Sequence, residues 1–240
     1  MPKLADIRAR SHWTDMLQGQ PQHLAMAVLM STGALSLLAL PTAETTDTAT
    51  YESLLWLDST GWARLSIALA LLHQGLVALV FRLQLHRNVM SRLFGARDML
   101  VWGWMFLPLL AARPLTLLAS GLTDPTQISR WEPAEFLLGL LLLVPALWTL
   151  HSVITRFTIR RALGGDHFRD EIAELPLVRR GAFRRVPNAM YTLAFLGLWA
   201  IALLTHSWNA LVLALFHHGY IWVHMYCTES PDMGWIYPRQ

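Results

Sequence analysis

The sequence predicts an all-α, polytopic integral membrane protein, a single membrane domain of about six transmembrane helices ending in a helical hairpin. Three observations predict this class. Of the 240 residues, 54% are hydrophobic and only 15% are charged, which is too apolar for a soluble domain of this length. The apolar residues gather in blocks of about 20, the length that a helix needs to cross a bilayer. The basic residues concentrate in alternate loops.

Hydropathy places the six membrane spans at roughly 22–40, 62–83, 98–119, 133–155, 189–204 and 208–226. A polar segment of about 20 residues precedes the first apolar block, so we interpret this block as a span and not as a cleavable signal. Residues 1–155 then hold the four N-terminal spans, and residues 156–240 hold the final hairpin. Cys227 is the only cysteine, so no intrachain disulfide can form.

The arginines predict the orientation. Loop 41–61 contains four acidic residues and no Lys or Arg, whereas loop 82–97 contains four arginines and no acidic residue. Segment 155–187 holds eight arginines. If six spans alternate, 16 of the 19 basic residues lie on one side, and the positive-inside rule predicts that this side and both termini are cytoplasmic. We therefore expect a multi-pass protein of the cytoplasmic (inner) membrane, whose basic charge contacts membrane lipids and not nucleic acid.

The segment at 155–187 is the one substantial polar stretch between spans. It contains Gly164-Gly165, which predicts a break after a helix that extends from the fourth span. Phe168, Ile172 and Leu175 follow at amphipathic spacing, so we expect a short helix on the membrane surface. The alternative is a solvated connector.

The start of the hairpin predicts an anion-binding site. Pro187 favours an extended residue before it and can open the fifth helix, which leaves unpaired backbone N–H groups beside Asn188 and Tyr191. A helix start favours a carboxylate or phosphate ligand, and Arg184 and Arg185 strengthen this preference.

The sixth helix returns the chain to the same face of the membrane. It delivers Glu229 to the membrane boundary, where a carboxylate can pair with a bound cation. A salt bridge with one of the loop arginines is an equal alternative for this residue.

Several short motifs together resemble a known family. They are Gly165-Asp166-His167-Phe168, then Asn188-Ala189-Met190-Tyr191, then Thr228-Glu229-Ser230-Pro231 with Ile236-Tyr237 downstream. In order and spacing, they resemble the phosphatidylethanolamine N-methyltransferase family of integral membrane enzymes, over roughly residues 150–238. The Arg-x-Pro-Asn-x-x-Tyr pattern at 185–191 is more distantly similar to the isoprenylcysteine carboxyl methyltransferases.

The resemblance implies a membrane methyltransferase that uses S-adenosyl-L-methionine and N-methylates the headgroup amine of a phospholipid, phosphatidylethanolamine or its methylated derivatives. Another lipophilic acceptor, with a thiol or a carboxylate, is the alternative. The cofactor pocket would lie at the cytosolic end of the last helices, in region 156–240. Carried over residue by residue, the cofactor-binding positions are Gly164, Gly165, Asn188, Tyr191 and Glu229. The sequence departs from the family where Val186 replaces a histidine and Thr228 replaces the first residue of a Glu-Glu pair.

The reaction itself assigns further roles. Methyl transfer from a sulfonium needs no metal, but the acceptor amine must lose its proton before it can react. We therefore expect Glu229 to pair with the cofactor or to accept this proton, with His218 and His167 as rival bases, and Tyr191 to orient a ligand. Three arginines are expected to bind the substrate phosphate: Arg180, Arg184 and Arg185.

Two other features have alternative interpretations. Several histidines lie in or near spans, and histidines on facing helices can hold a haem, so a haem-binding electron carrier is an alternative function. His73 and His151 could face each other, and His217 and His224 share one face of a helix. Arg113, inside the third span, either contacts a lipid phosphate or, as we favour, snorkels or pairs with one of two acidic residues, Asp124 and Glu132. The oligomeric state is not predicted.

Overall fold

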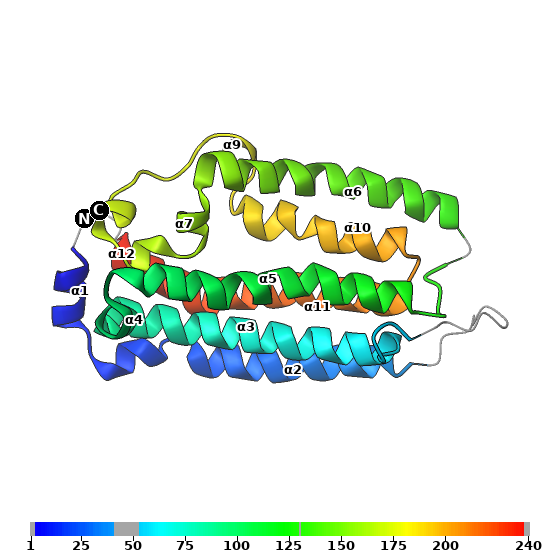
Figure 1. Ribbon diagram of the computed structural model, residues 1–240, viewed down its shortest axis with the longest axis horizontal. Coiled ribbons are helices and arrows are strands. Elements are labelled where there is room, and N and C mark those ends of the chain that lie inside the picture. The colour runs from blue at the N-terminus through cyan, green and yellow to red at the C-terminus, as the bar shows by residue number, and fades with distance from the viewer. Residues whose placement is uncertain (1–2, 41–52, 130, 238–240) are drawn as a thin grey trace.

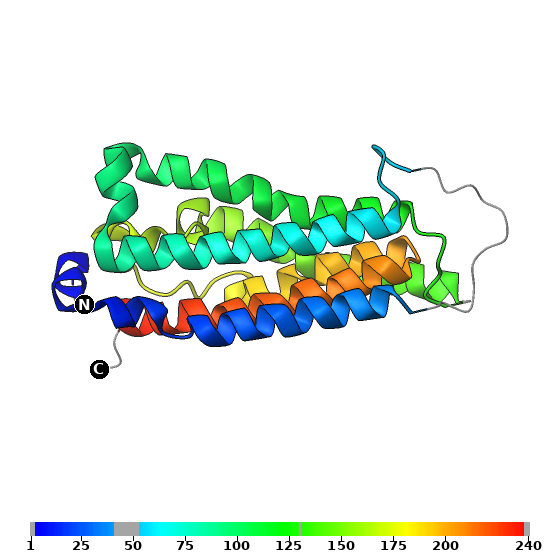
Figure 2. The ribbon, with the colours of Figure 1, turned by 90° about the horizontal axis from the view of Figure 1, so that it is seen from below.

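The protein folds as an all-α bundle of six apolar helices that lie side by side (Figures 1 and 2). The computed structural model describes residues 3–40, 53–129 and 131–237. Within these residues there is no β-strand, and each predicted span corresponds to a helix, so the predicted fold class is confirmed. The six helices are α2 (Gln20–Leu38), α3 (Ser59–Arg87), α5 (Asp98–Leu122), α6 (Glu132–Ser152), α10 (Leu196–Leu204) and α11 (Trp208–His224).

Four helical stretches among the described residues are long and apolar enough to cross a membrane. They are Ser59–Arg87, Val89–Leu122, Glu132–Phe157 and Trp208–Ile236. The fifth predicted span is the shorter apolar helix Met190–Leu204, and α2 has 19 residues. The chain is therefore a multi-pass membrane protein.

Helix α3, which holds the second predicted span, is longer than predicted. Asp58 begins α3 by accepting a hydrogen bond at 2.7 Å from the backbone N–H of Gly61, and Asn88, in the left-handed region at φ 57°, ends it. The short helix α4 (Val89–Phe94) then turns the chain into α5 through η2 (Gly95–Arg97). Arg82, expected in a loop, therefore lies inside α3 and is buried.

The arginine-rich elements and both ends of the described chain lie at one end of the bundle. The helix α1 (Leu4–Arg10) packs against the C-terminal helix α12 (Ser230–Ile236) there, through Leu4, Ile7 and Ile236 (Figure 1). A short 3₁₀ turn, η1 (Trp13–Leu17), connects α1 to α2. The chain thus returns to its starting end, as alternating spans require. Most of the predicted acidic loop, residues 41–52, lies outside the described residues.

The segment after α6 is a series of short turns that packs onto this end of the bundle. It contains η3 (Val153–Phe157), α7 (Ile159–Ala162), η4 (Gly165–His167), α8 (Asp170–Ala173) and α9 (Ala182–Arg185). The predicted break is present: Gly164 has φ 72°, and a Cβ there would lie 2.3 Å from the Phe81 ring.

The prediction that Phe168, Ile172 and Leu175 lie on the membrane surface is wrong for the first two. Phe168 and Ile172 are buried within the protein, and only Leu175 is exposed. The indole N–H of Trp102 donates a hydrogen bond at 2.9 Å to the backbone carbonyl of Leu163. This contact holds the segment against α5, so its apolar side chains pack on the bundle and not on lipid.

Candidate active site

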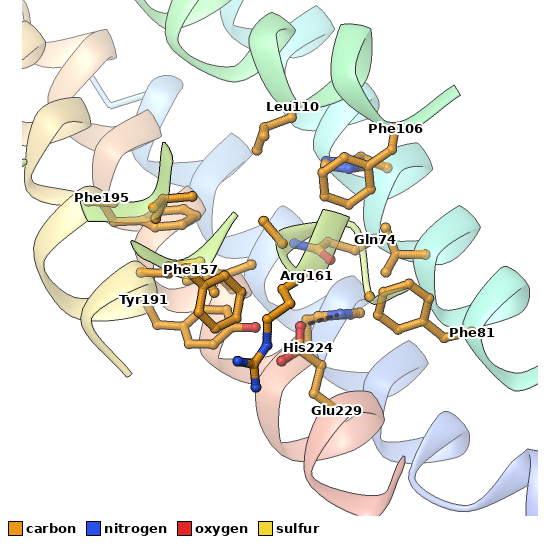
Figure 3. Close-up of a pocket in the computed structure, with 18 of the residues that line it drawn as sticks. Gln74, Phe81, Phe106, Leu110, Phe157, Arg161, Tyr191, Phe195, His224 and Glu229 are labelled. Carbon is orange, nitrogen blue, oxygen red and sulfur yellow. Dashed lines mark ion pairs between the residues drawn. The ribbon is translucent and has the colours of Figure 1, made fainter. Parts of the chain in front are cut away.

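A cavity of about 270 Å³ lies between the helices at the arginine-rich end of the bundle and reaches into the membrane-spanning part. It is lined by α3, α5, α11 and the segments that follow α6 and precede α10. Figure 3 shows Tyr191, Arg161, His224 and Glu229 at one end of the cavity and Phe106 and Leu110 at the other. The cavity therefore has a polar end near the membrane boundary, and apolar side chains line much of its inner part.

Three π-helical turns surround the polar end. They are η3 (Val153–Phe157), η5 (Met190–Ala194) and η6 (Met225–Glu229), and they supply Phe157, Tyr191 and Glu229 to the cavity lining. A π-turn adds one residue to a helical turn and so changes the direction of its side chains, and such turns occur frequently at functional sites. The sequence of these turns does not distinguish them from ordinary helix.

Glu229 is the acidic group at the centre of this arrangement. Its Oε1 atom lies 3.5 Å from Nε2 of His224, and its carboxylate also interacts with the Tyr191 hydroxyl (Figure 3). The side chain of Glu229 retains 28% of its exposure, whereas that of His224 is buried. The carboxylate is thus held from one side and open to the cavity on the other, as a site for a cationic ligand requires.

A second polar group, next to the first, consists of Asp166, His167 and Asp232. His167 Nδ1 lies 2.9 Å from Asp166, and Nε2 lies 3.2 Å from Asp232. Burial opposes the charged imidazolium, but the hydrogen bonds with the two carboxylates outweigh it and raise the pKa of His167 to about 10. His167 is therefore protonated and paired at both nitrogens near neutral pH, so it has no lone pair with which to accept a proton.

The structure brings together some of the predicted cofactor residues. Gly164, Tyr191 and Glu229 line the cavity. Gly165 does not: a Cβ there would lie 2.5 Å from the carbonyl oxygen of Arg160, so this glycine permits close backbone packing. Asn188 is exposed, with φ 51°.

The backbone at the start of the hairpin also differs from the prediction. The carbonyl of Asn188 accepts hydrogen bonds from the N–H groups of Tyr191, at 2.8 Å, and Thr192, at 3.1 Å. The N–H of Tyr191, expected to be free for an anion, is therefore paired.

The third candidate base, His218, accepts a hydrogen bond at 2.9 Å from the Trp199 indole and does not line the cavity.

The three arginines predicted to bind the substrate phosphate lie outside this cavity. Arg180 and Arg184 line a separate exposed depression of about 620 Å³, together with Arg156 and Arg179. Arg185 is exposed and lines neither space. Together these side chains form a basic surface next to the candidate site.

Besides Asp166 and His224, four polar residues that sequence reasoning did not assign to the site line the cavity. Arg161 lies at its polar end, and His73, Gln74 and Arg113 lie deeper. Their only signal in the sequence is that they are polar residues in or beside apolar spans.

The interpretation favoured for Arg113 is wrong. The residue is only 2% exposed, so it does not snorkel, and within the described residues it forms no ion pair. Asp124 instead accepts hydrogen bonds from Ser207 and from the backbone of Asn209, and Glu132 is exposed.

The histidine pairs do not form an obvious haem site. His73 lines the main cavity, whereas His151 is exposed and lines the basic depression. His217 and His224 are both buried, as their shared helical face predicts, but His217 contacts Ser66 at 2.9 Å and His224 contacts Glu229.

The match to a protein-family model falls on the region that holds Glu229 and Tyr191. Residues 134–240 match the family model described as phospholipid methyltransferase. A phosphatidylethanolamine N-methyltransferase of Scheffersomyces stipitis is 33% identical over 73 residues, which is 30% of this chain and 8% of the relative. One from Debaryomyces hansenii is 27% identical over 103 residues, 43% of this chain and 12% of the relative.

The matched segments thus span about a tenth of the length of these curated relatives. No solved structure matches the chain. The family match covers the hairpin and the turns before it. Residues 134–240 of this chain therefore resemble the phospholipid methyltransferase family, as the sequence motifs predicted.

Proposed function

We propose that this protein is an S-adenosylmethionine-dependent methyltransferase that N-methylates the headgroup amine of a phospholipid within the membrane. The observation that carries the proposal is the cavity at the arginine-rich end of the bundle. Its carboxylate, Glu229, and its ordered tyrosine, Tyr191, both lie in the region that matches phospholipid methyltransferases.

The residues at the polar end suit S-adenosylmethionine. Glu229 offers a carboxylate to a sulfonium cation, and the aromatic rings of Phe157 and Tyr191 provide faces that attract cations. Arg161, which lines the same end, suits a carboxylate of the methionine part. When bound, S-adenosylmethionine supplies the electrophilic methyl group.

The protein's own contribution is to position both reactants and to remove a proton. A headgroup amine is mostly protonated near neutral pH and reacts only as the free base, so a proton acceptor in the site contributes on the order of 100-fold or more. Glu229 is the candidate, because His167 is already protonated and His218 does not line the cavity. Alignment of donor and acceptor supplies up to about 7–11 kcal/mol of the barrier reduction.

The apolar side chains inside the cavity and the basic surface outside it suggest how the lipid arrives. Phe106 and Leu110 of α5 line the inner end, which suits the apolar part of a lipid. The exposed Arg180, Arg184 and Arg185 attract anionic headgroups at the membrane surface. We further propose that this arginine-rich surface faces the cytoplasm, as the positive-inside rule predicts. Arg180, Arg184, Arg185, Gly165 and Asn188 would then support the site from outside the cavity.

The test is transfer of labelled methyl groups from S-adenosylmethionine into membrane lipids by the purified protein, followed by chromatography. Label in a phospholipid with a methylated amine is the expected result. Label in a lipophilic thiol or carboxylate would correct the acceptor, and an absence of label from all extracted lipids would contradict the proposal. Light absorption by the same sample checks for haem, which the proposal does not require.

Tyr191→Phe tests the role of the tyrosine hydroxyl. Because this hydroxyl interacts with Glu229 and the residue is buried, we expect turnover to fall about 10-fold, the effect of one lost hydrogen bond to a charged group. Steady-state methyl transfer measures this, and Tyr226→Phe, which alters an exposed tyrosine of the same hairpin, is the matched control. Equal turnover in the two variants would reduce Tyr191 to a packing residue.

Arg185→Ala tests the basic surface. One arginine near an anionic membrane contributes about 1 kcal/mol, so the apparent KM for an anionic lipid surface should rise about fivefold in low salt. The difference from the original protein should vanish near about 1 M salt, where charges are screened within about 3 Å. If the ratio of the two proteins' KM values stays constant across the salt series, Arg185 does not attract the lipid surface and serves only to orient the protein in the membrane.

A further inference from the structure

Another charged group, Arg113, lies deeper in the cavity, in the membrane-spanning part of α5. The Nε atom of Arg113 donates a hydrogen bond at 3.3 Å to Nδ1 of His73. The two terminal nitrogens, Nη1 and Nη2, are buried and have no hydrogen-bond partner within the described part of the chain. The residue is 2% exposed and lines the cavity. A buried cation without a counter-ion is costly in a membrane protein, so a ligand is expected to complete it.

The unpaired atoms of this group are all hydrogen-bond donors. Because Nδ1 of His73 accepts a hydrogen bond, the neutral ring carries its proton on Nε2, and this atom is also buried without a partner. The guanidinium has no acceptor atom. Gln74, the next residue of α3, also lines the cavity, and its amide can serve a ligand either as donor or as acceptor. The guanidinium and the His73 ring, by contrast, offer only donors. The missing partner must therefore bring acceptor oxygens.

The surroundings of Arg113 favour an anion attached to an apolar molecule. The guanidinium carbon lies 5.8 Å from the centre of the Phe195 ring, and the Phe106 ring lies 4.7 Å from that of His73. In these apolar surroundings an ion pair is much stronger than in water. A guanidinium also matches the oxygens of a phosphate in a two-pronged contact, which an ammonium group cannot make.

We propose that Arg113, supported by His73, binds the phosphodiester of the acceptor lipid at the membrane-embedded end of the cavity. This inference rests on the proposed function. It gives the cavity a direction, with a carboxylate, Glu229, at one end and a guanidinium at the other. Tyr191 lines the same cavity, interacts with Glu229 and is close enough to Arg113 for an electrostatic interaction. A zwitterionic headgroup fits this arrangement with its amine toward Glu229 and its phosphate toward Arg113.

The experiment compares Arg113→Gln and Arg113→Lys with Arg97→Gln, which removes an exposed arginine just before the same helix. Each purified variant is assayed for labelled methyl transfer to two acceptors, phosphatidylethanolamine and a long-chain primary amine without phosphate. Binding of S-adenosylhomocysteine by calorimetry shows that the fold and the donor site are intact. Retention of phosphatidylethanolamine, measured by native mass spectrometry, reports lipid binding without turnover.

For Arg113→Gln we expect kcat/KM for phosphatidylethanolamine to fall about 10- to 100-fold, the effect of losing charged hydrogen bonds. For the phosphate-free amine the change should stay within about threefold, because no anionic contact is lost. Arg113→Lys should lie between, since it keeps the charge and loses the two-pronged contact. Arg97→Gln should match the original protein with both acceptors.

Three results would overturn the proposal. They are equal lipid retention by Arg113→Gln and the original protein, an equal loss with both acceptors, and loss of S-adenosylhomocysteine binding, which would assign Arg113 to the donor. If Arg113→Gln does not fold, His73→Leu removes one donor, leaves the guanidinium in place, and should give a smaller loss confined to the phosphate-bearing acceptor. The original protein could also transfer methyl groups to neither acceptor and still retain lipid through Arg113. This result would reject the proposed function but support the anion site.

Discussion

Glu229→Gln is expected to weaken binding of S-adenosylmethionine about 10- to 100-fold and to reduce methyl transfer at least as much. The substitution removes the negative charge and keeps the shape, so it tests the charge alone. Loss of a hydrogen bond or ion pair with a charged partner corresponds to about 1.5–3 kcal/mol in a partly buried site. Turnover should fall further if Glu229 also accepts the proton of the acceptor amine.

The charge of the ligand makes this prediction sharper. S-adenosylhomocysteine lacks the sulfonium charge, so its affinity should fall less than that of S-adenosylmethionine in Glu229→Gln. Calorimetry with both ligands measures the difference, and Glu174→Gln, which alters an exposed carboxylate at the same end of the protein, is the control. Equal losses for the two ligands would mean that Glu229 does not recognise the sulfonium, and unchanged affinities would remove it from the site.

The bundle could be predicted because hydropathy and helix length act locally. Each of the six helices has a core of apolar residues that a bilayer favours along its whole length, whatever its neighbours are. The returning hairpin likewise placed Glu229 and Tyr191 near one another. The break at Gly164 followed from glycine's access to positive φ, which the structure confirms at 72°.

The rest depends on contacts between distant residues. Phe168 packs in a buried cluster with Trp102, whose indole also donates a hydrogen bond to the carbonyl of Leu163, 61 residues away. Arg113 has two acidic candidates nearby in sequence, and only the packing shows that neither reaches it. The π-turns have no composition of their own, so the direction of Glu229 could not be read from the chain.

The buried ion pair between Arg82 and Asp232 was not predicted either, and it holds α12, the helix that follows Glu229, against α3. Nη1 of Arg82, in α3, lies 2.8 Å from Oδ1 of Asp232, and both side chains are almost fully buried. The other carboxylate oxygen of Asp232 contacts His167 at 3.2 Å. Arg82 also donates hydrogen bonds to the backbone carbonyls of Gln18, at 2.9 Å, and Cys227, at 3.3 Å. The pair thus ties α3 and the start of α2 to the turn that precedes α12.

Asp232→Asn should therefore destabilise the protein by about 3–5 kcal/mol, because it leaves the Arg82 guanidinium buried without its counter-ion. Thermal unfolding in detergent measures this loss, and Glu171→Gln, which changes an exposed carboxylate, should leave the unfolding temperature unchanged. A double variant, Arg82→Met with Asp232→Leu, removes both charges and should recover much of the stability, since a buried ion pair often contributes little beyond an apolar pair of similar volume. Methyl transfer should not recover with it, because the turn that holds Glu229 loses its contacts with α3. Recovery of both properties would show that the pair serves folding alone, and full stability of Asp232→Asn would show that water reaches Arg82.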